Sequence, residues 1–223
     1  MLSNVQESGT TDQNHPSYIL VWDIPTRLFH WLLVLCFVVA YLTSESERWQ
    51  LWHVTAGYTF GFLLLFRLCW GIIGTRYARF TDFVRGPKAV MHYLSTLLTR
   101  HPTHYIGHNP AGAWAIIAII SLGGLTVFTG WASFNDYGDW IGEVHEGIVN
   151  GLLLIISIHV LGVLASSLLH RENLMRAMIN GRKQGQPADA IRYPQWIIAM
   201  LLILALATFL WTLLSGRLPG LLP

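Results

Sequence analysis

Five apolar runs alternate with polar segments along this chain, and each run is long enough to cross a membrane as a helix. A spanning helix needs about 20 consecutive, mostly apolar residues. We expect spans at residues 26–43, 51–74, 111–131, 140–171 and 193–214. The pattern predicts an all-α integral membrane bundle with five transmembrane helices.

The boundaries of the first span are marked by local signals. Asp23 followed by Pro25 is typical of a helix start, with the aspartate as cap and the proline in the first turn. Trp22 stands where an aromatic residue at the membrane interface is expected. The polar residues 1–17 are expected to be a disordered tail, 18–192 the membrane domain with a four-helix core, and 193–223 an additional C-terminal transmembrane helix.

The long polar connection at residues 76–110 contains one further helical pattern. Gly86-Pro87 opens it, and the spacing of the apolar residues that follow forms a single stripe on a helix. These residues are Val90, Met91, Leu94, Leu97 and Leu98. The run is too short to span, so we expect an amphipathic helix lying at the membrane surface.

Composition supports a membrane protein and excludes several classes of function. Hydrophobic residues make up 53% of the 223 residues and charged residues only 12%, about half the usual share for soluble domains. No C-x-x-C-H motif is present, so covalent haem attachment is excluded. Cys36 and Cys69 fall in apolar runs and are expected to be small buried residues. No cleavable signal peptide, nucleophile–base pair, phosphate loop or nucleotide fingerprint is found, so we expect a redox subunit without nucleic-acid partners.

The basic residues predict an orientation in the bacterial inner membrane. Five Lys and Arg residues lie in 76–100 and five in 171–192, and five spans place both segments on one side. The other side carries Arg48 and Arg217 together with acidic residues: Glu45, Glu47, Asp136, Asp139 and Glu143. Because cytoplasmic loops are enriched in basic residues, we expect a cytoplasmic N-terminus and a periplasmic C-terminus.

Two histidines lie within the fourth apolar run, His145 and His159. No charged residue occurs between Glu146 and His170. Fourteen positions separate the two histidines, close to four whole helical turns, so both rings point from roughly the same face. They lie about 21 Å apart along the axis, one near each membrane surface. Ionisable residues inside a spanning helix are costly and indicate function.

Two more histidines match these two depths. His30 begins the first span and His53 the second, and the alternating helix directions place His30 near the inner surface and His53 near the outer one. Depth therefore pairs His53 with His145 and His30 with His159, at two levels roughly 20 Å apart. A single membrane histidine is often a hydrogen-bonded packing residue, but four that sort into level pairs favour ligands.

The second span carries two further candidates. Gly57 and Gly61 follow His53 at one-turn steps, which indicates either a packing seam between helices or a flat surface for a planar cofactor. Arg67 lies inside the same span at the depth of the inner pair. A buried arginine needs an anionic partner or a wet cavity, and a haem propionate would supply the first.

The ligand number selects among the metals that imidazole binds. A closed zinc site usually has four nitrogen or sulfur ligands, whereas haem iron needs only two from the protein. Two histidines per level therefore favour two b-type haems, and iron with two histidine ligands transfers electrons and has no open position for small ligands. A haem-free ion or proton carrier that uses intramembrane histidines remains an alternative.

Several motifs resemble the prokaryotic cytochrome b family, which includes the membrane subunit of nickel–iron hydrogenases and the bacterial cytochrome b-561 type. The resemblance covers roughly residues 18–190. The motifs are Val21-Trp22-Asp23 with Arg27-Leu28-Phe29-His30-Trp31, Trp52-His53 with Gly57-Tyr58, Arg67 with Trp70-Gly71 and Gly74, and Gly107-His108-Asn109-Pro110-Ala111-Gly112. His145 and His159 match the family's fourth-helix ligands.

The resemblance implies a four-helix core with two b haems, electron exchange with quinone, and a periplasmic redox partner such as a c-type cytochrome or a hydrogenase-like protein. It supports ligand roles for His30, His53, His145 and His159, and leaves the partner and any homo-oligomer open. An alternative is a stand-alone quinone oxidoreductase acting on a small molecule such as superoxide. His101, His104 and His108 could bind a metal, deliver protons to quinone with His170, or belong to a solvated loop.

Overall fold

The computed structural model describes residues 17–97, 103 and 105–218. Five helices in this part of the chain are long and apolar enough to cross a membrane. They are α1 (Ile24–Thr43), α2 (Gln50–Ile73), α5 (Pro110–Phe134), α6 (Trp140–His170) and α8 (Trp196–Leu214). The predicted all-α bundle of five spans is confirmed, with helix ends within a few residues of those expected. Residues 1–16, predicted to form a tail, lie outside the described residues.

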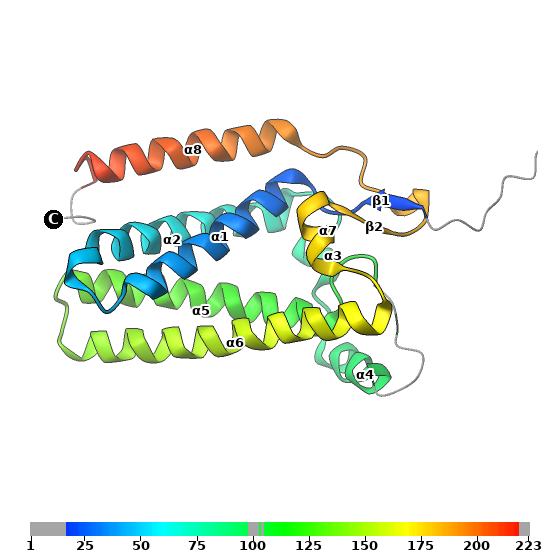
Figure 1. The fold of residues 1–223 in the computed structure, drawn as a ribbon, viewed down its shortest axis with the longest axis horizontal. Coiled ribbons are helices and arrows are strands. Elements are labelled where there is room, and N and C mark those ends of the chain that lie inside the picture. Colours follow the sequence, from blue (N-terminus) through cyan, green and yellow to red (C-terminus); the bar gives the residue numbers. More distant parts are fainter. Residues whose placement is uncertain (1–16, 98–102, 104, 219–223) are drawn as a thin grey trace, which may run out of the picture.

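Four of the spanning helices pack as two antiparallel pairs, α1 with α2 and α5 with α6, and α2 also contacts α5. Figure 1 shows α8 outside these four, where it packs on α1 and α2. One apolar cluster joins α2 to α6 through Phe60, Leu64 and Leu152. A second joins α1, α2 and α8 through Phe29, Leu63 and Leu202. The bundle is therefore held by van der Waals packing of large apolar side chains between helices.

The two ends of the bundle differ in how much chain covers them. One end, which we call the ribbon end, carries β1 (Tyr18–Leu20), β2 (Arg182–Gln184), α3 (Phe80–Phe83), α4 (Pro87–Leu97), α7 (Leu174–Asn180) and the 3₁₀ turn η2 (Pro187–Asp189) (Figure 1). The opposite end, the loop end, has only the 3₁₀ turn η1 (Glu47–Trp49) and the short connection from α5 to α6. The two strongly basic segments of the chain both belong to the ribbon end.

A two-stranded antiparallel ribbon joins the start of the chain to the segment after α6. β1 pairs with β2 so that Ile19 faces Lys183 in the register. Ser17 extends the pairing, since its hydroxyl donates to the carbonyl of Gly185 and its carbonyl accepts from the Gly185 amide. The sequence pattern did not predict the ribbon or α3, because three or four residues are too few to show a period.

The interfacial position predicted for Trp22 is wrong. Its side chain is 7% exposed and packs with Ile19, Tyr77 and Ile191 in an apolar cluster at the ribbon end. Because β1 pairs with β2, the segment before α1 packs against the end of the bundle. The Trp22 side chain is therefore buried in protein and does not contact the membrane interface. The predicted cap of α1 is confirmed, since the Asp23 carboxylate accepts from the Thr26 amide at 2.7 Å.

The predicted surface helix is α4, which begins at Pro87 as expected. Met91 and Leu94, two residues of its apolar stripe, are exposed, which suits a helix that rests on lipid. Tyr93 faces the opposite way, is 2% exposed, and reaches the Ser166 hydroxyl on α6 at 3.5 Å. Tyr93 thus fastens the surface helix to the bundle.

Candidate functional site

His53 on α2 and His145 on α6 lie side by side toward the loop end. Their ring centroids are 6.3 Å apart and their planes are at 83°. Two bonds of about 2 Å from a metal to imidazole nitrogens, added to the half-widths of two rings, span about this distance. The structure therefore brings together the two residues predicted to form the outer pair, at a separation that suits a single metal ion between them.

Hydrogen bonds define which nitrogen of each ring carries a proton. His53 Nδ1 lies 2.8 Å from the carbonyl oxygen of Ala40, which can only accept, so Nδ1 donates. His145 Nδ1 lies 3.1 Å from the hydroxyl of Thr129, and that hydroxyl donates its own proton to the carbonyl of Leu125. Both rings therefore carry the proton on Nδ1. Their Nε2 lone pairs are left for a ligand bond, and second-shell acceptors of this kind orient metal-bound histidines.

Two glycines make room around the loop-end pair. A Cβ at Gly130 on α5 would stand 2.9 Å from the ring of His145, so only glycine lets that ring lie against α5. At Gly57, one turn after His53, no protein atom lies within 4 Å of where a Cβ would stand. The face of α2 beside His53 thus offers a flat surface without a side chain, as a planar group requires.

His30 on α1 and His159 on α6 lie toward the ribbon end. Both side chains are partly buried and close enough for their charges to interact. The Nδ1 atom of His30 is buried and has no hydrogen-bond partner among the described residues. A buried polar atom without a partner is costly, so this ring differs from His53 and His145 in that its second nitrogen is not held by the protein.

Arg67 is buried near the ribbon end of α2, with 5% of its surface exposed. Its guanidinium lies over the rings of Phe80 at 4.5 Å and of Phe29 and Phe83 at 5.7 Å. It also donates a hydrogen bond of 3.0 Å to the carbonyl of Ala78. Cation–π contacts of this kind stabilise a desolvated arginine. α3 supplies two of the three rings, which explains why the sequence pattern did not reveal this cage.

Asp23 lies at the same end of the bundle as Arg67, and its side chain is 1% exposed. Besides capping α1, its carboxylate accepts hydrogen bonds from Trp70 Nε1, at 3.2 Å, and from the hydroxyl of Thr75. The charges of Asp23 and Arg67 also interact. These contacts fix the start of α1 against the end of α2, and therefore fix the position of His30, which lies two turns along α1.

His108 precedes α5 and faces the same region. Its ring lies 4.6 Å from that of Trp22 and 4.5 Å from that of Phe83, and its Nδ1 atom is buried with no partner among the described residues. Burial, followed by the charge of Arg67, lowers the pKa of His108 well below its usual value. His101 and His104, the other members of the predicted metal site, lie outside the described residues. Elsewhere in 17–97, 103 and 105–218 no three metal-binding side chains cluster.

A buried ion pair lies beside this region and was not predicted. Lys183 on β2 is 3% exposed and Glu172, just after α6, is 8% exposed, and their side chains approach to 3.3 Å. The ammonium of Lys183 also donates to the carbonyl of Tyr105 at 3.2 Å. In the sequence, both residues look like ordinary members of a basic, solvated loop. Only the long-range pairing of β2 with β1 buries them.

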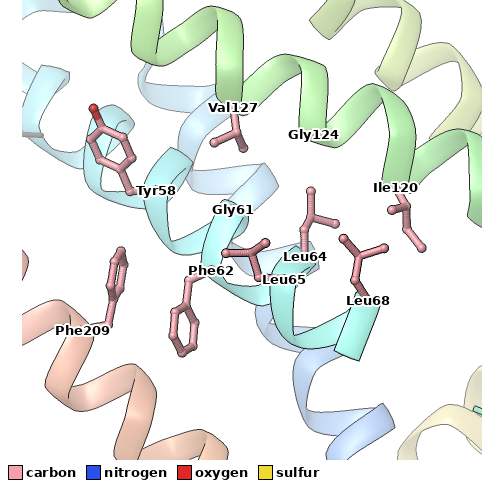
Figure 2. Close-up of a pocket in the computed structure, with 10 residues that line it drawn as sticks. All are labelled: Tyr58, Gly61, Phe62, Leu64, Leu65, Leu68, Ile120, Gly124, Val127 and Phe209. Carbon is pink, nitrogen blue, oxygen red and sulfur yellow. The ribbon is translucent and has the colours of Figure 1, made fainter. Parts of the chain in front are cut away.

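One groove in the described structure is lined by none of the four histidines. It measures about 360 Å³ and lies between α2, α5 and α8. Figure 2 shows Tyr58, Phe62 and Leu65 reaching into it from α2, opposite Phe209 of α8. Its lining is almost entirely apolar and Leu65 at its edge is 64% exposed, which suits contact with lipid chains and offers no ligand for a metal.

The residues at both levels fit a b haem. At the loop end, both Nε2 atoms are open to a ligand, the Ala40 carbonyl and the Thr129 hydroxyl orient the two rings, and Gly57 leaves the helix face without a side chain. The ribbon-end pair offers two rings at the same end of the bundle as a buried cation, Arg67. Covalent attachment is not needed, since haem is held by axial ligands and packing. The ligand roles of the histidines, Arg67 and Gly57 remain predictions.

Comparison with known proteins agrees with this arrangement. The family model described as prokaryotic cytochrome b561 matches residues 21–181, which include all four histidines. The chain belongs to the prokaryotic cytochrome b561 family. It is therefore a multi-pass membrane cytochrome that transfers electrons through b-type haem.

Curated relatives of this cytochrome are named as hydrogenase subunits. It is 24% identical over 210 residues to the probable Ni/Fe-hydrogenase 1 B-type cytochrome subunit of Escherichia coli, covering 72% of this chain and 88% of that protein. It is 23% identical to the probable Ni/Fe-hydrogenase B-type cytochrome subunit of Cupriavidus necator, covering 72% and 85%. No solved structure matches. The resemblance first suggested by the motifs is thus confirmed at the level of the family.

Proposed function

We propose that this cytochrome transfers electrons across the bacterial inner membrane through two b haems, between the quinone pool and a periplasmic redox partner. His53 and His145 would hold one haem, and His30 and His159 the other. The observation that carries the proposal is the pairing of His53 with His145, because both rings donate from Nδ1 and keep Nε2 for a ligand bond. Bound haem supplies reversible one-electron chemistry.

The orientation follows from the charges at the two ends. The ribbon end carries the segments 76–100 and 171–192, each with five Lys and Arg residues, which favours the cytoplasm. The loop end, and with it His53 and His145, then faces the periplasm, where a partner protein would meet the cytochrome. The curated relatives are hydrogenase subunits by name, which supports a partner of that kind or a c-type cytochrome.

The cytoplasmic end suits quinone because polar groups are buried there. Reduction of quinone to hydroquinone needs two protons as well as two electrons. His108, Arg67, Asp23 and the pair Lys183–Glu172 are the buried ionisable groups of this end. Arg67, packed against three phenyl rings, would keep a positive charge at the end of the bundle that carries His30 and His159, where it would pair an anionic group such as a propionate.

The test is a haem count on purified protein with single histidine variants. The expected result is two non-covalent b haems per chain for the wild-type protein in the reduced-minus-oxidised spectrum. Each single variant, His53→Ala or His159→Ala, should contain one haem per chain. His92→Ala is the control, since His92 is exposed on α4. Normal haem content in His159→Ala would overturn the assignment, and colourless wild-type protein would return the histidines to an ion-carrier role.

Partner and quinone use are tested separately. A reduced quinone analogue should reduce the haems of the isolated chain, whereas a small oxidant such as superoxide should not reoxidise them at a comparable rate without a partner protein. Rapid turnover between quinone and superoxide by the chain alone would favour a stand-alone oxidoreductase over the proposed subunit.

A further inference from the structure

We infer that Glu172, Lys183 and His108 form a proton relay between the cytoplasmic surface and the quinone that reacts near His30 and His159. The inference rests on the proposed function and names the protein groups that supply its protons. Three observations carry it: a buried ion pair, a histidine with a buried unpaired nitrogen, and a hydrogen bond from the ion pair to the segment that carries this histidine.

The ion pair is buried at the ribbon end, outside the spanning helices. Lys183 Nζ lies 3.3 Å from Glu172 Oε2, and Glu172 Oε1 accepts from the Gln184 amide at 3.1 Å. Replacing a buried ion pair by apolar residues is often neutral or stabilising. A charged pair beneath the redox site is therefore poorly explained by stability alone.

The contacts of Lys183 lead toward the redox site. Its ammonium donates to the carbonyl of Tyr105, in the segment that also carries His108. Burial lowers the pKa of Lys183, although Glu172 opposes that shift. A desolvated ammonium gives up its proton more readily than a solvated one. Lys183 therefore joins the Glu172 side of the ribbon end to the segment before α5.

His108 links Lys183 to the two histidines. Its ring interacts electrostatically with Lys183, and also with Arg67, His159 and His30. These charged or titratable groups come from β2, α2, α6 and α1, and they are the groups whose charges lower the pKa of His108. Trp22 and Phe83 hold the ring between them. Because the Nδ1 atom has no partner among the described residues, it is available to accept a proton from a bridging water or give one to a ligand.

Over one reaction the relay side chains neither gain nor lose protons. A quinone that has gained two electrons from the cytochrome takes up two protons on its carbonyl oxygens to become hydroquinone. His108 takes up a proton on Nδ1 from the Lys183 ammonium and passes that proton to the quinone oxygen, which leaves the ring neutral again. Lys183 in turn recovers a proton from the aqueous phase by way of Glu172. After each transfer the three side chains return to their starting states.

The test compares two oxidants of the reduced, haem-loaded full-length chain. Haem reoxidation is followed by stopped-flow absorbance after mixing with a short-chain quinone, which takes up protons, or with ferricyanide, which takes up electrons alone. In Lys183→Met we expect quinone-driven reoxidation at least tenfold slower than in wild type, with the ferricyanide rate and the haem content unchanged. Added methylamine or imidazole should partly restore the quinone rate.

The control is the double variant Lys183→Met/Glu172→Leu, which removes both charges and keeps an apolar core. A relay predicts that it is as slow with quinone as Lys183→Met. Recovery of the wild-type rate in the double variant would overturn the relay and leave the pair a structural role. Wild-type haems that quinone does not reoxidise at all would instead overturn the proposed use of quinone, and the relay with it.

Discussion

The two histidine pairs lie in different surroundings. At the loop end, His53 and His145 each donate from Nδ1, to the Ala40 carbonyl and to the Thr129 hydroxyl. The glycines at positions 57 and 130 leave space beside these two rings. At the ribbon end, His30 has a buried Nδ1 without a partner among the described residues, and the same end contains the buried side chains of Asp23, Arg67, Glu172 and Lys183. Hydrogen bonds fix the ring orientations of the first pair. The second pair lies at the end of the bundle that contains buried ionisable side chains.

Under the proposed function, this difference would separate electron transfer from proton-coupled chemistry within one bundle. Electron transfer alone needs ligands, an apolar wall and little rearrangement, which the loop end provides. A reaction that also moves protons needs ionisable groups within reach of water, and the described structure buries them at the ribbon end alone. The three predictions below test the two ends against each other, beginning with the largest effect.

Replacing Gly57 by valine should remove the haem of the loop end and leave the other. No protein atom lies within 4 Å of a Cβ at this position, so the chain itself tolerates the side chain and only a bound planar group would meet it. We expect haem content to fall by about half, measured by haem extraction per chain. Gly124→Val on α5 is the matched control, since its Cβ is equally free. Equal haem content in the two variants would contradict a cofactor on the Gly57 face.

Replacing Thr129 by valine should weaken haem binding at the loop end only. The change keeps the shape of the side chain but removes the acceptor for His145 Nδ1. Loss of such a second-shell partner typically costs 10–100-fold in metal affinity, so we expect haem to be lost about tenfold more readily to an apo-protein scavenger. Thr208→Val, whose hydroxyl also bonds to a carbonyl one turn earlier on α8, is the control. A ribbon-end haem lost at the same increased rate would argue for a general loosening of the bundle.

Replacing His108 by phenylalanine should make the protein less sensitive to acid. Burial lowers the pKa of His108 in the folded chain to about 3, whereas an unfolded chain has the usual value of about 6.5. Below pH 6.5 the unfolded state therefore binds the proton that the folded state does not, and stability falls as the pH drops toward 3. A phenyl ring keeps the packing on Trp22 and Phe83 and removes this proton uptake.

The readout is the thermal unfolding midpoint in detergent at pH 7 and pH 5. Between these two pH values the wild-type protein loses about 2 kcal/mol through His108, so the midpoint of the variant should fall by about 4–8 °C less than that of wild type for a chain of this size. An equal fall in both proteins would show that His108 does not contribute to acid sensitivity.

Much of the fold was open to prediction because its causes are local. Hydropathy over about 20 residues defines a span, and Asp23 with Pro25 defines the start of α1. The depth argument also placed His53 beside His145, because helix rise and alternating direction are simple geometry. α4 was predictable for the same reason, since its stripe repeats with the helical period.

The missing parts depend on contacts between distant residues. The strands of the ribbon have three residues each, and their pairing joins positions about 165 residues apart. That pairing buries Trp22, Lys183 and Glu172, all of which look exposed when judged from neighbouring residues. The phenyl cage of Arg67 likewise depends on α3 folding back under α2. At the candidate site, the closeness of His53 and His145 was therefore predictable, whereas the burial of ionisable groups at the ribbon end was not.

The ribbon also imposes an order on the making of the protein. β1 lies at the start of the chain, yet its partner β2 follows all four helices of the core. At a synthesis rate of about 5–20 residues per second, the roughly 160 intervening residues keep β1 waiting for on the order of 10 s. During that interval the ribbon cannot form, while the first four spans are already able to insert. The ribbon is therefore one of the last contacts of the membrane domain that can be made during synthesis.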